Sequence, residues 1–157
     1  MREEDPPDSL DPLDPAEVLN ELRHAFRHGA RAALLTHHAP RLVDLLTPPP
    51  ADAAQPAATL PRRARETEKL IRIAIAELGG DDAAALSIMF GLTRHAANSS
   101  ASARRRAAAR RLGIQPDTFR RPNHEGVLML DLAMRLCDLT FIRVARLSGL
   151  QACDLRC

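Results

Sequence analysis

Apolar residues recur mainly three and four positions apart along this chain, which is the spacing of one face of an α-helix. The clearest example is the segment 62–78, in which charged residues lie mainly on the opposite face. Its apolar face is made of Leu70, Ile71, Ala74, Ile75 and Leu78. Val18, Leu22 and Phe26 follow the same spacing and predict a first helix from about Pro15 to His37.

Capping residues, glycines and prolines mark the ends of the predicted helices. Asp14 before Pro15 is a typical start, because an Asp side chain caps a helix and proline is favoured in its first turn. The glycine pair at 79–80 ends one helix, and Asp81 or Asp82 is expected to cap the next. The predicted helices cover residues 15–37 (weakened at Gly29), 40–46, 62–78, 83–90, 103–112, 118–121 and 125–148.

Composition agrees with an all-α fold. Aromatic residues make up 3% of the chain, with no Trp or Tyr, and there are seven glycines. A β-sandwich or barrel normally needs more aromatic and β-branched residues. We therefore expect a compact bundle of five or six helices with a helix-turn-helix-like corner, preceded by an N-terminal helical arm.

The proline-rich stretches suggest how the chain is divided. Residues 1–13 are rich in proline and acids and are expected to be disordered. Residues 47–61 contain five prolines and no helical periodicity, which is typical of a linker or long loop. The predicted parts are an acidic tail at 1–13, a helical arm at 14–46, a linker at 47–61, a helical domain at 62–150 and a C-terminal tail at 151–157.

The charges are segregated, although the net charge is only +2. Residues 1–17 hold seven acidic residues and one basic residue, for a net −6. Residues 101–121 hold seven arginines and one aspartate, for a net +6. Such asymmetry indicates an anionic partner, or an acidic tail that covers a basic face. Lysine appears only once, at Lys69, and codon bias in a GC-rich genome is the plainer explanation for so many arginines.

Cysteine usage and hydropathy favour the cytoplasm. The three cysteines have no paired CxxC framework, which fits a reducing compartment. The acidic, proline-rich start is unlike a signal peptide. The longest apolar stretch, 127–147, carries five charged residues and is not expected to span a membrane.

The segment AAARRLGIQPDTFRR has the pattern of two helices joined by a tight turn. Ala109 is the small residue on which the second helix packs, and Gly113 supplies the turn. Leu112 and Ile114 flank that glycine, and Phe119 is the first inward residue of the second helix. At these positions the segment resembles the helix-turn-helix of bacterial transcription regulators, which implies binding to double-stranded DNA.

Pro122 departs from that pattern, because a proline there ends the second helix after about five residues. Ser102 and Asp117 are the expected caps of the two helices. Only the tip of so short a helix would enter a major groove. The candidate base contacts are Gln115, Thr118, Arg120 and Arg121, and the candidate phosphate contacts are Arg104, Arg105, Arg106, Arg110 and Arg111.

A second resemblance covers residues 62–140. The segment ETEKLIRIAIAELGGDDAAALSIMFGLT, a loop, RRRAAARRLGIQPDTFRR and a long apolar helix together resemble a small helical module that recurs in actinobacterial proteins. No activity is assigned to that module. The resemblance implies a cytoplasmic, regulatory or signalling context rather than a particular chemistry.

Catalytic and cofactor motifs are missing from the sequence. It has no nucleophile elbow, P-loop or dinucleotide-binding glycines, so we expect no enzyme and no cofactor. His24 and His28 are spaced as metal ligands can be, but a solvated polar face explains them better than a metal site. Asp131 and Arg135 are expected to form a surface ion pair at i,i+4.

Two functions from different classes remain open. The first is a small DNA-binding regulatory protein that uses residues 104–121. The second is a non-catalytic interaction adaptor, whose partner protein or second copy would bind the amphipathic first helix or the broadly apolar last helix. The positions of Arg120 and Arg121 separate the two. An exposed convex face favours DNA, whereas pairing with acids of a neighbouring helix favours the adaptor.

Overall fold

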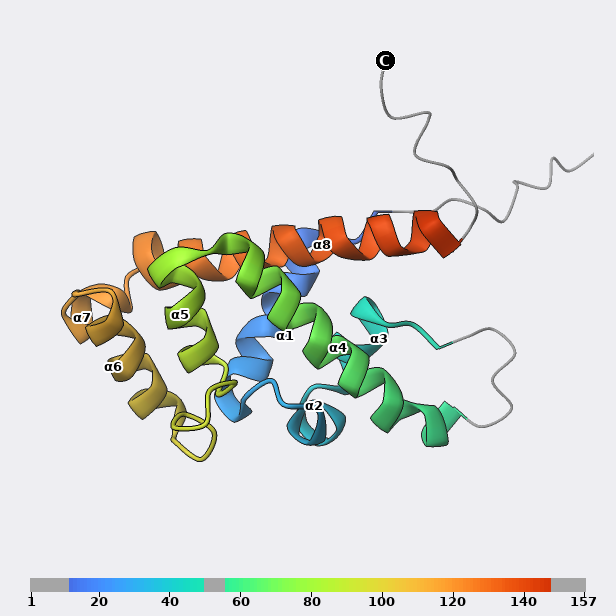
Figure 1. The fold of residues 1–157 in the computed structure, drawn as a ribbon, viewed down its shortest axis with the longest axis horizontal. Coiled ribbons are helices and arrows are strands. Elements are labelled where there is room, and N and C mark those ends of the chain that lie inside the picture. The colour runs from blue at the N-terminus through green and yellow to red at the C-terminus, as the bar shows by residue number, and fades with distance from the viewer. Residues whose placement is uncertain (1–11, 50–55, 148–157) are drawn as a thin grey trace, which may run out of the picture.

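The computed structural model describes residues 12–49 and 56–147, and within these ranges it is all-helical, as the sequence predicts (Figure 1). The predicted tails at 1–11 and 148–157 and the centre of the predicted linker, 50–55, lie outside the described residues. The elements are α1 (Pro15–His28), α2 (Ala32–His38), α3 (Pro40–Leu46), α4 (Pro56–Leu78), α5 (Gly80–Met89), α6 (Ala101–Arg111), α7 (Pro116–Phe119), the π-helical turn η1 (Pro122–Gly126) and α8 (Val127–Leu147).

The long helix α8 runs along one side of the elongated molecule (Figure 1). Both α1 and α4 pack against it, while α2 and α3 pack against α4. Helix α5 packs on α6, and α6 contacts α7, so that α6 and α7 form one end of the molecule, at the left in Figure 1.

Helices α1 to α3 belong to the same hydrophobic core as the rest of the bundle. Val18 and Leu22 of α1 are fully buried in one cluster with Ile71 of α4 and Leu132 of α8. The apolar face of α1 must be removed from water, and α8 offers the surface that covers it. The described residues therefore contain no separate N-terminal arm, because residues 14–46 are part of the bundle itself.

The predicted first helix is divided at Gly29. Its φ of +105° is left-handed, and an added Cβ would lie 3.2 Å from Leu34 Cδ1 and 3.3 Å from the Phe90 carbonyl oxygen. Glycine is needed at such a position. The next amide, Ala30 N–H, donates to that same carbonyl at 2.8 Å. The chain therefore turns from α1 into α2 while it remains attached to the end of α5.

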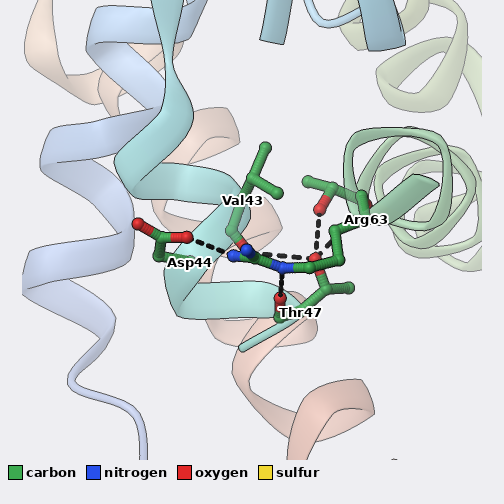
Figure 2. Close-up of polar contacts among 5 residues, drawn as sticks. Val43, Asp44, Thr47 and Arg63 are labelled. Atoms are coloured by element: carbon green, nitrogen blue, oxygen red, sulfur yellow. Dashed lines mark hydrogen bonds and ion pairs between the residues drawn. The ribbon is translucent and has the colours of Figure 1, made fainter. Parts of the chain in front are cut away.

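Helix α4 starts at Pro56, earlier than the predicted Arg62, and Pro61 lies inside it. The joint between α3 and α4 is tied by Thr47 and Arg63 (Figure 2). The Thr47 hydroxyl lies 2.9 Å from Thr67 Oγ1, and Arg63 Nε donates to the Thr47 carbonyl at 2.7 Å. Arg63 also pairs with Asp44. These contacts hold Thr47, the first residue of the predicted linker, against α4 just beyond the linker's last residue.

The helix caps agree with the sequence only in part. The Asp14 side chain accepts from the Ala16 amide at 2.8 Å, as predicted. Ser100, not Ser102, caps α6 by accepting from the Ala103 amide at 3.2 Å. The other predicted caps lie instead within the first helical turn, Asp81 and Asp82 in α5 and Asp117 in α7. The N-cap residues there are Gly79 and Gln115.

Candidate nucleic-acid interface

The structure has a tight corner between α6 and α7. Gly113 adopts a left-handed φ of +67°, and the Ile114 amide donates to the Ala109 carbonyl at 2.9 Å across the turn. Ala109 and Phe119 are both fully buried, so the small residue of α6 and the aromatic residue of α7 lie in the core as the sequence predicts. The corner is thereby held at a fixed angle.

Helix α7 has four residues and ends at Phe119, two residues before the predicted end at Arg121. The backbone is extended at Arg121, and Pro122 then occupies the first position of η1, which continues into α8. Pro122 does not end a helix, as the sequence suggested, but begins one, because proline lacks the amide hydrogen that a first helical turn leaves unpaired. Only Gln115 and Thr118 of α7 remain as polar candidates for a base contact, and Thr118 is half-buried.

Arg104 is not available for a phosphate. Its residue surface is 3% exposed, and the guanidinium donates to three main-chain carbonyls. Nε donates to Met89 at 2.7 Å, Nη1 donates to Ser99 at 2.6 Å, and Nη2 donates to Phe26. Every acceptor is a backbone oxygen, and none of the described carboxylates pairs with Arg104. The prediction that Arg104 contacts DNA is therefore wrong.

The positions of the three acceptors explain how a buried cation is tolerated. Phe26 and Met89 lie in the last turns of α1 and α5, where carbonyls have no partner within the helix and the helix dipole is negative. Burial lowers the pKa of Arg104, but arginine stays protonated at neutral pH. Arg104 thus joins the ends of two helices to α6 by capping their carbonyls.

Arg105 is also engaged within the protein. Its Nε and Nη2 donate to the two carboxylate oxygens of Glu125 at 2.6 and 2.8 Å, in a bidentate pair. Its guanidinium carbon lies 4.8 Å from the centre of the Phe26 ring, close enough for a cation–π contact. Both charged groups are mostly buried. Arg105 therefore fixes η1 to α6, and it is not the unpaired surface arginine that the predicted phosphate contact assumes.

The remaining predicted arginines lie on the outside of the corner. Arg106 and Arg110 are exposed and four residues apart on α6, and Arg120 and Arg121 are exposed after α7. No acidic side chain of the described residues pairs with these four arginines. We call Arg106, Arg110, Arg120 and Arg121 the outer arginines. They give one end of the molecule a set of free guanidinium groups.

The environment of Arg111 is intermediate between that of the engaged Arg104 and Arg105 and that of the outer arginines. It pairs with Asp81 at 2.9 Å, but both side chains are more than half exposed. Such pairs contribute little to stability and can exchange with another anion.

The three histidines near the junction of α1 and α2 form a small surface cluster. The rings of His28 and His38 stack with centres 4.0 Å apart, and His24 lies 6.5 Å from His28. Desolvation lowers the pKa of His28, as do the neighbouring His38 and His24. Within the described ranges no group of three His, Cys, Asp or Glu side chains could hold a metal ion. Nor is any described helix long and apolar enough to cross a membrane.

Comparison with known proteins found no matching family model, no matching curated protein and no matching solved structure. The function must therefore be inferred from the geometry of this chain. The resemblances to a helix-turn-helix and to an actinobacterial module stay predictions.

Proposed function

We propose that this protein is a small regulatory protein that binds double-stranded DNA through the corner of α6 and α7. The observation that carries the proposal is the exposure of Arg120 and Arg121 without an acidic partner among the described residues. Together with Arg106 and Arg110 they offer four cations on adjoining elements at one end of the molecule. Phosphate oxygens are the anions that such a spread of guanidinium groups fits best.

The short α7 limits how much sequence the protein can read. Gln115 is exposed at its start and can pair with adenine, whereas Thr118 is half-buried. Asp117, in the first turn of α7, is exposed and repels phosphate there. Binding should therefore rest mainly on phosphate contacts and depend strongly on salt, with modest preference for sequence.

The buried contacts behind the corner favour this function. Arg104 attaches α6 to α1 and α5, and Phe119 attaches α7 to the core. A rigid corner presents its cations with little loss of backbone freedom on binding. The cytoplasm is the compartment in which we place such a protein.

Fluorescence anisotropy with a labelled duplex over a salt series tests the proposal. If the four outer arginines each contact one phosphate, log K should fall with log salt at a slope of about −3.6. The variant Arg120→Ala/Arg121→Ala should reduce that slope by about 2. Arg65→Ala/Arg146→Ala is the matched control, since both arginines are exposed, unpaired among the described residues and remote from α6 and α7 along α4 and α8.

Equal losses in the two variants would mean that only net charge matters, and would remove the corner as the binding surface. No binding at about 50 mM salt, where phosphate contacts are strong, would exclude DNA binding altogether. In that case the adaptor function becomes the leading one. It has independent support in the exposed apolar surface of α8, where Met134 is 52% exposed.

A further inference from the structure

Helix α8 has two apolar faces, and only one of them is covered. The inner face packs on α1 and α4. It is made of Leu128, Met129, Leu132, Ala133 and Leu136, all buried. The opposite face carries a stripe of large apolar side chains that are between 40% and 52% exposed. We call Val127, Leu130, Met134 and Phe141 the outer stripe.

The outer stripe is both concentrated and regular. Of the six large apolar side chains that are exposed in the described residues, five lie on α8. Its four members are three, four and seven residues apart, which is the heptad spacing that a partner helix recognises. Grouped exposed apolar side chains mark interaction sites, and methionine adapts well to a partner.

Carboxylates border this stripe. Asp131 and Asp138 are exposed, one heptad apart, and lie beside the stripe on the helix surface. Arg135, the expected partner of Asp131, lies instead 3.4 Å from Glu77 of α4. Among the described residues neither aspartate has a basic partner. Two carboxylates are therefore left free next to an uncovered apolar surface.

A groove of about 630 Å³ between the start of α1 and α8 adjoins the stripe at Asp138 and Phe141. The groove is lined by Pro12, Leu13, Asp14, Pro15, Cys137, Asp138 and Phe141. Burial raises the pKa of the Cys137 thiol, and the charges of Asp138 and Asp14 raise it further. Both carboxylates therefore act on the same groove, which continues the outer stripe through Phe141.

We infer that the outer stripe of α8 binds an amphipathic helix of another protein, with basic residues along the side of that helix's apolar face that meets Asp131 and Asp138. Apolar residues at heptad spacing would pack on Met134 and its neighbours, and lysines or arginines would reach Asp131 and Asp138. This inference rests on the adaptor function and specifies that the partner is a basic amphipathic helix. It does not depend on DNA binding, because the outer arginines belong to other elements.

A second copy of this chain fits the stripe less well. Antiparallel pairing that aligns the heptads would place Asp131 of one copy next to Asp138 of the other, and like charges oppose association. Parallel pairing would leave both carboxylates without a cation. Residues 1–11 carry five acids and one arginine, so charge also opposes them as the occupant. The charges favour a basic partner.

Two labelled model peptides test the inference on the full chain. Both peptides have leucine at heptad spacing over about three heptads. One peptide has lysine at the positions that flank the leucines, and the other has glutamate there. By anisotropy, the lysine peptide should bind at least about tenfold more tightly than the glutamate peptide at low salt. Asp131→Asn/Asp138→Asn should remove most of this difference, and Met134→Glu should abolish binding.

Controls separate the surface from the fold. Ile73→Glu places the same charge at an exposed apolar position on α4 and should leave peptide binding unchanged. Met134 and both aspartates are exposed, so circular dichroism and melting temperature should stay close to those of the parent chain. Arg120→Ala/Arg121→Ala should not alter peptide binding, so that failure of the DNA proposal remains distinguishable from failure of this one.

Several results would overturn the inference. Equal binding of the two peptides, or binding of neither, would show that Asp131 and Asp138 do not select a basic helix. A dimer in light scattering that Met134→Glu dissociates would assign the stripe to a second copy. Peptide binding that appears only after deletion of residues 1–11 or 148–157 would assign it to a terminus of this chain.

Discussion

Two groups of arginines lie within two turns of α6 and have opposite environments. Arg104 and Arg105 face inward, where their guanidinium groups are occupied by three carbonyls and by Glu125. Arg106 and Arg110 face solvent, and no acid of the described residues pairs with them. Residue type does not separate these groups. Their phase on the helix does, because each step turns the side chain by about 100°.

The different environments of the inner and outer arginines also imply different roles, one in folding stability and the other in binding. A buried guanidinium must have all of its donors satisfied, so its removal leaves carbonyls unpaired and costs free energy of folding. An exposed guanidinium is solvated by water and can be replaced at little cost. The inner arginines should therefore determine whether α6 is held in place, and the outer arginines what it binds.

Replacing Arg104 should have the largest effect on stability. Arg104→Met keeps the apolar part of the side chain but leaves the carbonyls of Phe26, Met89 and Ser99 without their donor. We expect the free energy of unfolding to fall by about 3 kcal/mol. Urea denaturation measures it, with Arg106→Met as the matched control at a loss below about 0.5 kcal/mol. Similar losses in the two variants would contradict the different roles of the inner and outer arginines.

The pair of Arg105 and Glu125 should show a smaller, measurable coupling. A double-mutant cycle to alanine should give about 1 kcal/mol, because the pair is bidentate and mostly buried. The same cycle for Arg111 and Asp81 should give close to zero, because both side chains are exposed. Equal coupling energies would mean that burial does not decide the contribution of these pairs.

The outer arginines of α6 should affect DNA binding without affecting stability. Arg106→Ala/Arg110→Ala should change the free energy of unfolding by less than about 0.5 kcal/mol. The slope of log K against log salt should become shallower by about 2, as two phosphate contacts are lost. Denaturation and anisotropy on the same sample check both statements. A large loss of stability would place these residues with the inner group.

The smallest effect concerns pH. The pKa of His28 is lowered in the folded state, mainly by desolvation, then by His38 and His24, with Arg27 and the buried Arg104 also contributing. The folded protein therefore binds fewer protons at this site than the unfolded chain, whose pKa is the usual 6.5. Above pH 6.5 His28 does not affect the free energy of unfolding. As the pH falls from 6.5 to the lower pKa of the folded state, the free energy of unfolding declines.

Urea denaturation between pH 7.5 and pH 5, values chosen to bracket the usual histidine pKa of about 6.5, measures this decline. In His28→Gln the part due to His28 should disappear. His38→Gln should raise the pKa of His28, as followed by NMR titration, because a neighbouring cation is removed. A His28 pKa above 6.5 in the parent chain would reverse the sign and contradict the prediction.

The sequence predicted the helices better than the roles of the side chains. The start of α1 at Asp14-Pro15, the short helix 40–46 and the inward position of Phe119 are all confirmed. These features depend on local chemistry, namely capping, proline geometry and apolar spacing. The end of the predicted first helix was wrong, because the backbone turns at Gly29 and the next amide, Ala30 N–H, donates to the distant Phe90 carbonyl.

The candidate site was predicted only in part. The outer arginines are exposed as expected, but Arg104 and Arg105 were assigned to phosphates because a run of three arginines gives no direct sign of which one faces inward. A sign was present in the spacing, since Ala101 and Ala108 lie three residues before and four after Arg104 on one face. The identity of the acceptors could not be predicted, because they come from distant parts of the chain.

The contact between Arg104 and Phe26 joins residues 78 positions apart, and the Ala30 amide bonds to Phe90 beside it. Separation of α1 from α6 would leave a cation and several helix-end carbonyls without partners in a low-dielectric interior. The first helix is thus unsuited to opening alone, as a loosely attached arm would, and its amides should exchange with solvent together with those of α5 and α6. One arginine thereby joins the two halves of the chain into a single cooperative unit.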